Sequence, residues 1–348
     1  MARNSSTKTG NKPAEQPAEQ SANQSAYQIQ KMMYFKLLFL ITVAVVPLFA
    51  CDMPSDSIPV ETAPPPVTLK RMGFIEAEKL KEASGLQASH SNDGHFFSHN
   101  DDGKSEIFML NENGDNLGKM EIEPAKNKDW EDITSVPVGD EHWLVAGDIG
   151  DNGKKRKHIT LYFSAEPKPG KKGRYSGRLD LEHRLKLTYP DGPRDCESMS
   201  YDPIGDQILL LTKRDKPARL YAIDLQTALD KKEAELEFLG TISSLRPPTI
   251  ADRAKWGGRV DWISQPTGLD ISPDGNHAAV ITYRSLYRFH RKEGEDWLTA
   301  MQRKPEEVVG PPAKQNEAVA YSIDGKSIFV VTEKHPAPVY RFRFEDAR

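Results

Sequence analysis

The chain has 348 residues, of which 28% are charged, and its formal net charge is −4. This near-balance of charge argues against nucleic-acid binding, which needs a clustered basic face. The length suits two domains of about 150 residues each or one large all-β unit. The two cysteines, Cys51 and Cys196, are too few for a disulfide framework.

The N-terminal region begins with a polar segment, which an apolar segment follows. Residues 1–31 are rich in Ser, Asn, Gln, Lys and Ala, a composition that predicts a disordered tail. Residues 32–51 carry one charge, Lys36, followed by an uncharged apolar run from Leu37 to Ala50. This run is shorter than the ~20 residues that cross a bilayer as a helix, but it suits the apolar core of a signal peptide.

The apolar run ends in Leu-Phe-Ala-Cys at 48–51, which resembles the lipobox of bacterial lipoproteins. The resemblance implies that Cys51 is lipidated. A start at Met32 or Met33 would give a leader of ordinary length, so the tail before Met32 could be a mis-assigned start. An uncleaved anchor with an incidental Cys51 stays open as the alternative. Both place the rest of the chain in the bacterial cell envelope, and Asp52 resembles an inner-membrane retention signal. The Pro-, Ser- and acid-rich residues 52–67 predict an extended tether.

A strand–turn–strand phrase recurs in the remaining chain. Its first strands lie at 83–89, 130–136, 196–202, 266–272 and 316–322. Each leads through a Gly- or Asp-containing turn to a second apolar strand and a third strand with aromatic residues, which argues for an all-β fold. Repeats of about 40–50 residues, lengthened in places by insertions, predict a β-propeller. We therefore expect residues 68–348 to form one five-bladed propeller, with a sixth, poorly marked blade in 220–262 as the open alternative.

The last repeat shows three strands before the chain stops at Arg348. Residues 68–75 could supply its missing outer strand. Pairing the two ends of the chain in this way closes the ring and removes two exposed edges, which would otherwise invite aggregation.

Acids recur where each first strand begins and where its partner strand ends. In an antiparallel hairpin these two positions are neighbours, so the acids are expected at one mouth of the central channel. The set is Glu131, Asp148, Asp151, Glu197, Glu317 and Glu333. Close carboxylates need a counter-charge, and Ca²⁺ takes 6–8 oxygen ligands, so we expect calcium there. The alternative left open is that each acid caps its own turn or pairs with a nearby Lys or Arg.

Other polar side chains at the same strand ends are candidates for ligand contact. They are Asp132, Asn152, Lys213, Arg214, Tyr283, Arg284, Lys334 and His335. Trp256 and Trp262 flank a long insertion that could overhang this mouth. The sequence contains no GxSxG elbow, P-loop or Rossmann fingerprint, so it names no reaction.

The DWED and DIGDN segments at 129–132 and 148–152, together with the CES and NEA phrases and the leader, resemble a known group. It is the SdiA-regulated and phytase-like esterase group of bacterial β-propeller proteins. The resemblance implies a propeller that is often metal-binding, and it transfers no catalytic residue. Two functions remain open: a membrane-tethered monomer that binds a small molecule or protein at the mouth, and a metal-dependent hydrolase of esters or phosphoesters.

Overall fold

The computed structural model describes residues 67–257, 260–311 and 315–345. The predicted tail, the leader with Cys51 and nearly all of the tether lie outside these residues. None of the described helices has the length and apolar character needed to cross a bilayer.

The strands form five sheets, one for each predicted repeat, and we number these blades in chain order. Blade 1 contains β2 (Ala83–Ala88), β3 (His95–Asn100), β4 (Glu106–Asn111), β5 (Asn116–Glu123) and β9 (Arg178–Asp180). Blade 2 contains β6 (Trp130–Val138), β7 (Glu141–Asp148), β8 (Ile159–Ala165), β10 (His183–Thr188) and β14 (Glu233–Glu235). Blade 3 contains β11 (Cys196–Asp202), β12 (Gln207–Thr212), β13 (Ala218–Asp224) and β15 (Glu237–Ile242). Blade 4 contains β16 (Pro266–Ile271), β17 (His277–Thr282), β18 (Ser285–His290) and β19 (Glu306–Val309). Blade 5 contains β20 (Asn316–Tyr321), β21 (Ser327–Thr332), β22 (Pro338–Phe344) and β1 (Val67–Phe74).

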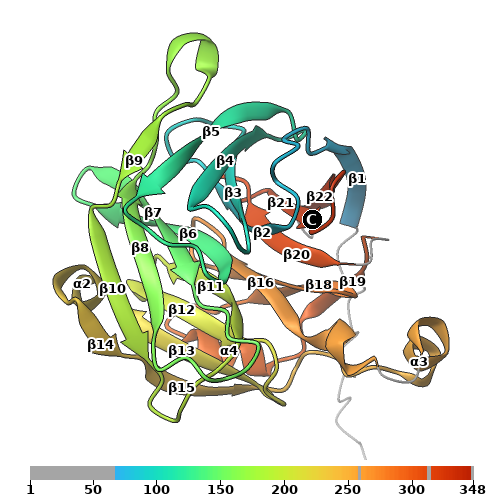
Figure 1. Cartoon of the computed structure of the whole chain (residues 1–348). Coiled ribbons are helices and arrows are strands. Elements are labelled where there is room, and N and C mark those ends of the chain that lie inside the picture. The colour runs from blue at the N-terminus through green and yellow to red at the C-terminus, as the bar shows by residue number, and fades with distance from the viewer. Residues whose placement is uncertain (1–66, 258–259, 312–314, 346–348) are drawn as a thin grey trace, which may run out of the picture. The chain divides into compact units, whose positions relative to one another are not determined.

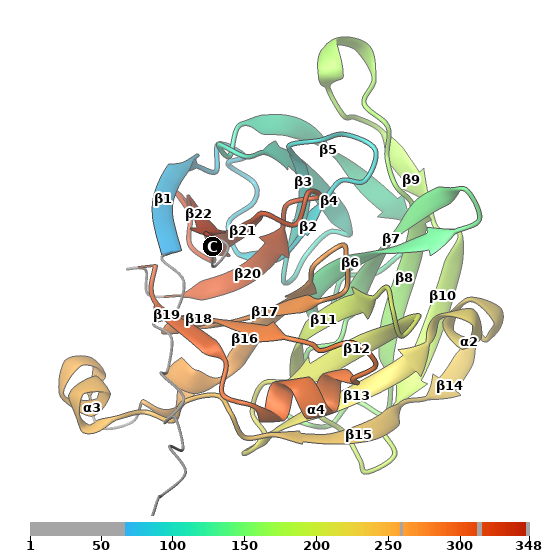
Figure 2. The same ribbon diagram turned by 180° about the vertical axis from the view of Figure 1, so that it is seen from behind.

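The innermost strands β2, β6, β11, β16 and β20 contact one another in this order, and β20 returns to β2. The sheets are therefore arranged as a closed ring (Figures 1 and 2). Blade 5 is completed by the N-terminal strand β1, which pairs antiparallel with β22 from Val67↔Phe344 to Phe74↔Pro338. The prediction of a five-bladed propeller closed by its N-terminal strand is confirmed.

The six-blade alternative is wrong because the segment 220–262 is used elsewhere. Its longest strand, β15, is the outer strand of blade 3, and β14 pairs in parallel with β10 of blade 2. The rest of the segment includes the helix α2 (Leu225–Asp230), the helix α3 (Ile250–Trp256) and the 3-10 turn η2 (Asp261–Ser264). The remaining helical elements are η1 (Lys171–Gly173) and α4 (Trp297–Gln302).

The core lies between neighbouring blades. Phe97 and Ile107 of blade 1, for example, belong to one buried cluster with Trp130 and Leu144 of blade 2. Each such side chain stabilises the fold by about 1.5–3 kcal/mol through burial of its apolar surface. Because this packing fixes the blades against one another, it also fixes the side chains at the ends of the innermost strands.

Candidate functional site

Each innermost strand is irregular near its first residues. The register with the second strand shifts between Ser84 and Leu86, Trp130 and Asp132, Cys196 and Ser198, Pro266 and Gly268, and Asn316 and Ala318. A β-bulge leaves one residue unpaired and re-aims its side chain. In blades 2, 3 and 5 the unpaired residue is a glutamate: Glu131, Glu197 and Glu317.

These three glutamates meet around one lysine. All three are buried, and each acts electrostatically on at least one of the others. Lys213, just after β12, donates a hydrogen bond from Nζ to the carboxylate of Glu197 and a second, of 2.9 Å, to the hydroxyl oxygen of Tyr283. Glu197 therefore contacts this ammonium group and lies 3.9 Å from the Arg214 guanidinium, while Glu131 and Glu317 act on the ammonium group or feel its charge.

Burial governs the protonation of this cluster. It raises the pKa of Glu197 to about 8 and that of Glu317 to about 7, although Lys213 opposes both shifts. Burial, reinforced by Glu197, also raises the pKa of Glu131 well above its ordinary range. For Lys213, burial alone would lower the pKa, but Glu197 and Glu317 together outweigh it and raise the pKa. The cluster therefore retains protons near neutral pH.

The other predicted metal ligands have partners of their own. Asp148 forms a 2.8 Å ion pair with Arg156, and Asp151 accepts a 2.7 Å hydrogen bond from the Arg156 backbone N–H. The Glu333 carboxylate accepts a hydrogen bond from the Gln315 amide. The structure thus brings Glu131, Glu197 and Glu317 together but gives the remaining three separate roles. Lys213 lies against Glu197 and Arg156 lies against Asp148, and calcium binding by these six residues stays a prediction.

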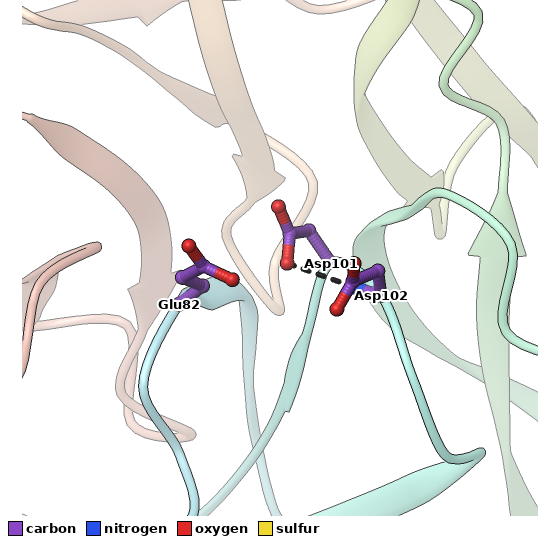
Figure 3. A group of neighbouring side chains, drawn as sticks. All are labelled: Glu82, Asp101 and Asp102. Carbon is purple, nitrogen blue, oxygen red and sulfur yellow. Dashed lines mark hydrogen bonds between the residues drawn. The ribbon is translucent and has the colours of Figure 1, made fainter.

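A different acidic group lies at the blade 1 side of the same mouth. In the part of the chain that the structure describes, Glu82, Asp101 and Asp102 bring one oxygen from each carboxylate within 4.8 Å of one another (Figure 3). Burial, and next the charge of Glu82, raises the pKa of Asp101 to about 6. Sequence reasoning did not select this group. The available signal was the register, since Glu82 directly precedes β2 and Asp101 directly follows β3.

A cavity of about 620 Å³, here the mouth cavity, lies beside the glutamate cluster. Its wall includes three predicted ligand-binding residues: Lys213, Arg214 and Tyr283. Sequence reasoning missed the other polar wall residues, which are Lys255, Gln265 and Gln315. The sequence offered two weak signals for these residues: Lys255 directly precedes Trp256, and Gln315 directly precedes β20.

Aromatic rings form the rest of the mouth cavity wall. Trp256 ends α3 and Trp262 lies in η2, so the predicted overhanging insertion supplies both. The rings of Trp256 and Trp262 are edge-on with centroids 5.7 Å apart, and those of Trp262 and Tyr283 are 5.2 Å apart. The Lys255 Nζ lies 5.2 Å from the centroid of the Trp256 ring. The helix α3 buries none of its side chains and stands apart from the blades (Figure 1).

Arg284 does not line this cavity, contrary to its prediction as a ligand contact. Its buried guanidinium forms a 3.0 Å ion pair with Asp252 at the start of α3 and lies 3.7 Å from Glu307. Arg246 binds the same two acids. Arg284 therefore anchors the insertion that carries the two tryptophans, and its role is one of positioning.

The remaining predicted contacts also lie away from the cavity wall. Asn152, Lys334 and His335 are exposed on loops of the same face. Asp132 is only 1% exposed, because its carboxylate lies inside the channel. It accepts hydrogen bonds from the backbone N–H groups of Ile133 (2.9 Å), Met199 (2.8 Å) and Leu269 (3.3 Å). These bonds tie together the innermost strands of blades 2, 3 and 4, so we assign Asp132 to stability instead of ligand contact.

No family model matches the chain, and no curated protein is significantly similar to it. Among solved structures, the β-propeller domain of Cps50 (Swd1) from Myceliophteria thermophila is similar, with a TM-score of 0.41 and 13% sequence identity over 80% of this chain and 100% of that chain. The five-blade assignment rests on the strand order described above. Membership of the SdiA-regulated and phytase-like esterase group stays a prediction.

Proposed function

We propose that this protein is a ligand-binding β-propeller whose mouth cavity holds a small anion that contains a ring. The observation that carries the proposal is the composition of the cavity wall, in which Trp256, Trp262 and Tyr283 stand beside Lys213, Arg214 and Lys255. Ligand sites are typically concave, largely apolar and provided with a few fixed polar groups. A volume of about 620 Å³ suits a small molecule.

The wall chemistry favours an acidic group on the ligand. The Arg214 side chain keeps 35% of its surface exposed while its guanidinium contacts Asp195, so its remaining N–H groups can bind a carboxylate or phosphate. Lys255 is exposed at the same wall. The tryptophan and tyrosine rings offer flat apolar faces for a sugar or aromatic ring. The amides of Gln265 and Gln315 add donors and acceptors for hydroxyl groups.

Binding is favoured over hydrolysis. A metal-dependent hydrolase needs carboxylates that hold the metal within reach of the substrate. The described residues that line the mouth cavity carry cations, rings and amides, whereas Glu197 lies behind Lys213. The buried glutamates are therefore better placed to fix Lys213 than to reach a substrate.

Two further parts of the proposal concern the surroundings of the site. The first is a lipid anchor at Cys51 that holds the propeller at the membrane of the bacterial cell envelope, and it is supported by the leader sequence. The second is calcium, for which Glu82, Asp101 and Asp102 are described residues that bring one carboxylate oxygen each within 4.8 Å of one another. Three carboxylate oxygens would supply part of a calcium shell, and water could complete it.

Calorimetry with matched pairs of compounds tests the ligand class. Glucuronate and glucose share a sugar ring, as benzoate and benzyl alcohol share an aromatic ring, and the members of each pair differ in the acidic group. We expect at least one anion to bind with a Kd at least tenfold lower than its neutral partner. Equal affinities within both pairs, or no heat with either anion at millimolar concentration, would contradict the proposal.

A further inference from the structure

A second cavity lies where the five innermost strands end, at the opposite mouth of the channel. Its volume is about 260 Å³. Every blade contributes to it, through Gln87, Thr134, Tyr201, Asp270 and Tyr321 in order of blade number. We call it the opposite cavity. It shares no lining residue with the mouth cavity, so it can be tested independently.

Asp270 is the charged group of the opposite cavity. It is 6% exposed, and its carboxylate accepts hydrogen bonds from Ser200 Oγ (3.1 Å) and from the Tyr321 backbone N–H (2.7 Å). Within the described ranges, it has no ion pair with a lysine or arginine. A buried carboxylate without a cation is costly, since its charge loses hydration. Burial accordingly raises the pKa of Asp270 to about 7. A bound cation would supply the counter-charge that the described residues do not give Asp270.

Three residues that line this cavity, Ser135, His142 and Tyr321, each have a buried polar atom without a partner in the described structure. Ser135 is buried, and neither its Oγ nor the buried Nδ1 of His142 forms a hydrogen bond in the described structure. Both residues line the opposite cavity. Most buried polar atoms in proteins are hydrogen-bonded, so these atoms leave hydrogen-bonding capacity for a ligand in the cavity that Asp270 also lines.

The wall around these groups is pre-organised. The ring of His90 stacks on that of His142, with centroids 3.7 Å apart and an interplanar angle of 7°. Glu166 holds the loop that carries His90, because its carboxylate accepts hydrogen bonds from Ser89 Oγ (2.6 Å) and the Ser91 backbone N–H (2.9 Å). Stacking therefore keeps His142 in place at the cavity.

We propose that the opposite cavity binds a small organic ammonium ion. A primary ammonium group has three N–H donors and one positive charge. The carboxylate of Asp270 supplies the counter-charge, and Ser135 Oγ and His142 Nδ1 supply neutral acceptors. Tyr201 and the His90–His142 pair surround the ligand's carbon atoms, and the Tyr201 ring adds a cation–π contact. The ligand class is thus set by acceptors that the fold buries and leaves unpaired.

The test is calorimetric titration of the propeller with n-butylammonium chloride and with n-butanol, which matches it in shape but has no charge. We expect the ammonium ion to bind and the alcohol to bind at least tenfold more weakly. Asp270→Asn should weaken ammonium binding at least tenfold, since Asn keeps the size and an acceptor for the Tyr321 N–H but removes the charge. Asp140→Asn, an exposed change in the β6–β7 turn on the same face, should leave the affinity unchanged.

A second variant guards against loss of fold at Asp270. Ile323 lies in a partly exposed turn at the rim of the opposite cavity, so Ile323→Trp should block it and remove ammonium binding without touching the channel. Equal affinity of the wild type and the Asp270→Asn variant would overturn the proposal. The proposal would also be overturned if Mg²⁺ gave binding heat that required Asp270 and n-butylammonium gave none, because the site would then be a metal site.

Discussion

The backbone N–H of Leu269 donates a 3.3 Å hydrogen bond to the carboxylate of Asp132, which lies 137 residues earlier in the chain. The same oxygen accepts the N–H of Met199 at 2.8 Å. One side chain of blade 2 therefore joins the innermost strands of blades 3 and 4 across the channel. The two cavities lie at opposite ends of the channel that this carboxylate crosses.

Removing this carboxylate should weaken the whole ring. Asp132→Ala leaves the N–H groups of Ile133, Met199 and Leu269 without their acceptor. Each unsatisfied buried group costs about 1–3 kcal/mol, so we expect the free energy of unfolding to fall by about 3–5 kcal/mol. Denaturation in guanidinium chloride measures this, with Asp140→Asn as a surface control. A variant as stable as the wild type would show that the three bonds are dispensable.

The glutamate cluster predicts a fall in stability at alkaline pH. Burial raises the pKa of Glu317 to about 7 from the ordinary value of 4.5, so the folded state binds a proton more tightly than the unfolded state. Its contribution is fully present below pH 4.5 and is lost as the pH rises through about 7. The loss from this group is on the order of 3–4 kcal/mol.

Glu317→Gln removes that titration. Between pH 5 and pH 8 the free energy of unfolding of the variant should therefore fall less than that of the wild type. Denaturation curves at the two pH values measure the difference, and Glu293→Gln, at an exposed position, is the matched control. If Glu317→Gln and Glu293→Gln show the same pH dependence, the Glu317 carboxyl does not titrate in this window.

Calcium should raise the Tm of the propeller through the acidic group of Figure 3. A ligand that binds only the native state stabilises it by mass action. Asp101→Asn should abolish the increase, whereas Asp148→Asn should retain it because Asp148 is paired with Arg156. Differential scanning calorimetry with and without millimolar CaCl₂ makes the comparison. Loss of the increase in Asp148→Asn but not in Asp101→Asn would return the ion to the residues predicted from the sequence.

Lipidation at Cys51 is expected from the leader and its terminal Leu-Phe-Ala-Cys. Cells that express the chain and grow with a labelled fatty acid should give a labelled band with the wild type and none with Cys51→Ala. The Cys196→Ala chain is the control and should keep its label, because Cys196 is buried in the propeller. A wild-type band without label would contradict the lipid anchor.

Repeat positions were sufficient to predict the ring. Strand starts share one face of a propeller, so Glu131, Glu197 and Glu317 could be expected together before any coordinates. Partners beyond the strand ends could not be predicted, because periodicity does not give the direction of a loop side chain: Arg156 turns back onto Asp148. Asp132 is the opposite case, since the bulge beside it leaves its carboxylate inside the channel.

The repeat pattern also did not predict the short outermost strands of blades 1 and 2. The strands β9 and β14 have three residues each and pair in parallel, so they show no alternation that could reveal them. The mouth cavity depends on an insertion in which Trp262 contacts Tyr283, and Arg284 anchors the helix α3 of that insertion. Such a long-range ion pair has no signature in one sequence.

The most direct test of the mouth cavity compares two variants of the same insertion, each of which truncates one large apolar side chain to alanine. Trp262→Ala removes the ring between Trp256 and Tyr283, whereas Ile250→Ala changes a residue of α3 that is 89% exposed and lies outside the cavity wall. In calorimetric titrations with benzoate and glucuronate, the tighter-binding anion should lose at least tenfold in affinity with Trp262→Ala and should bind Ile250→Ala like the wild type. Unchanged affinity in Trp262→Ala, with the anion still bound by the wild type, would contradict the assignment of this cavity as the ligand site.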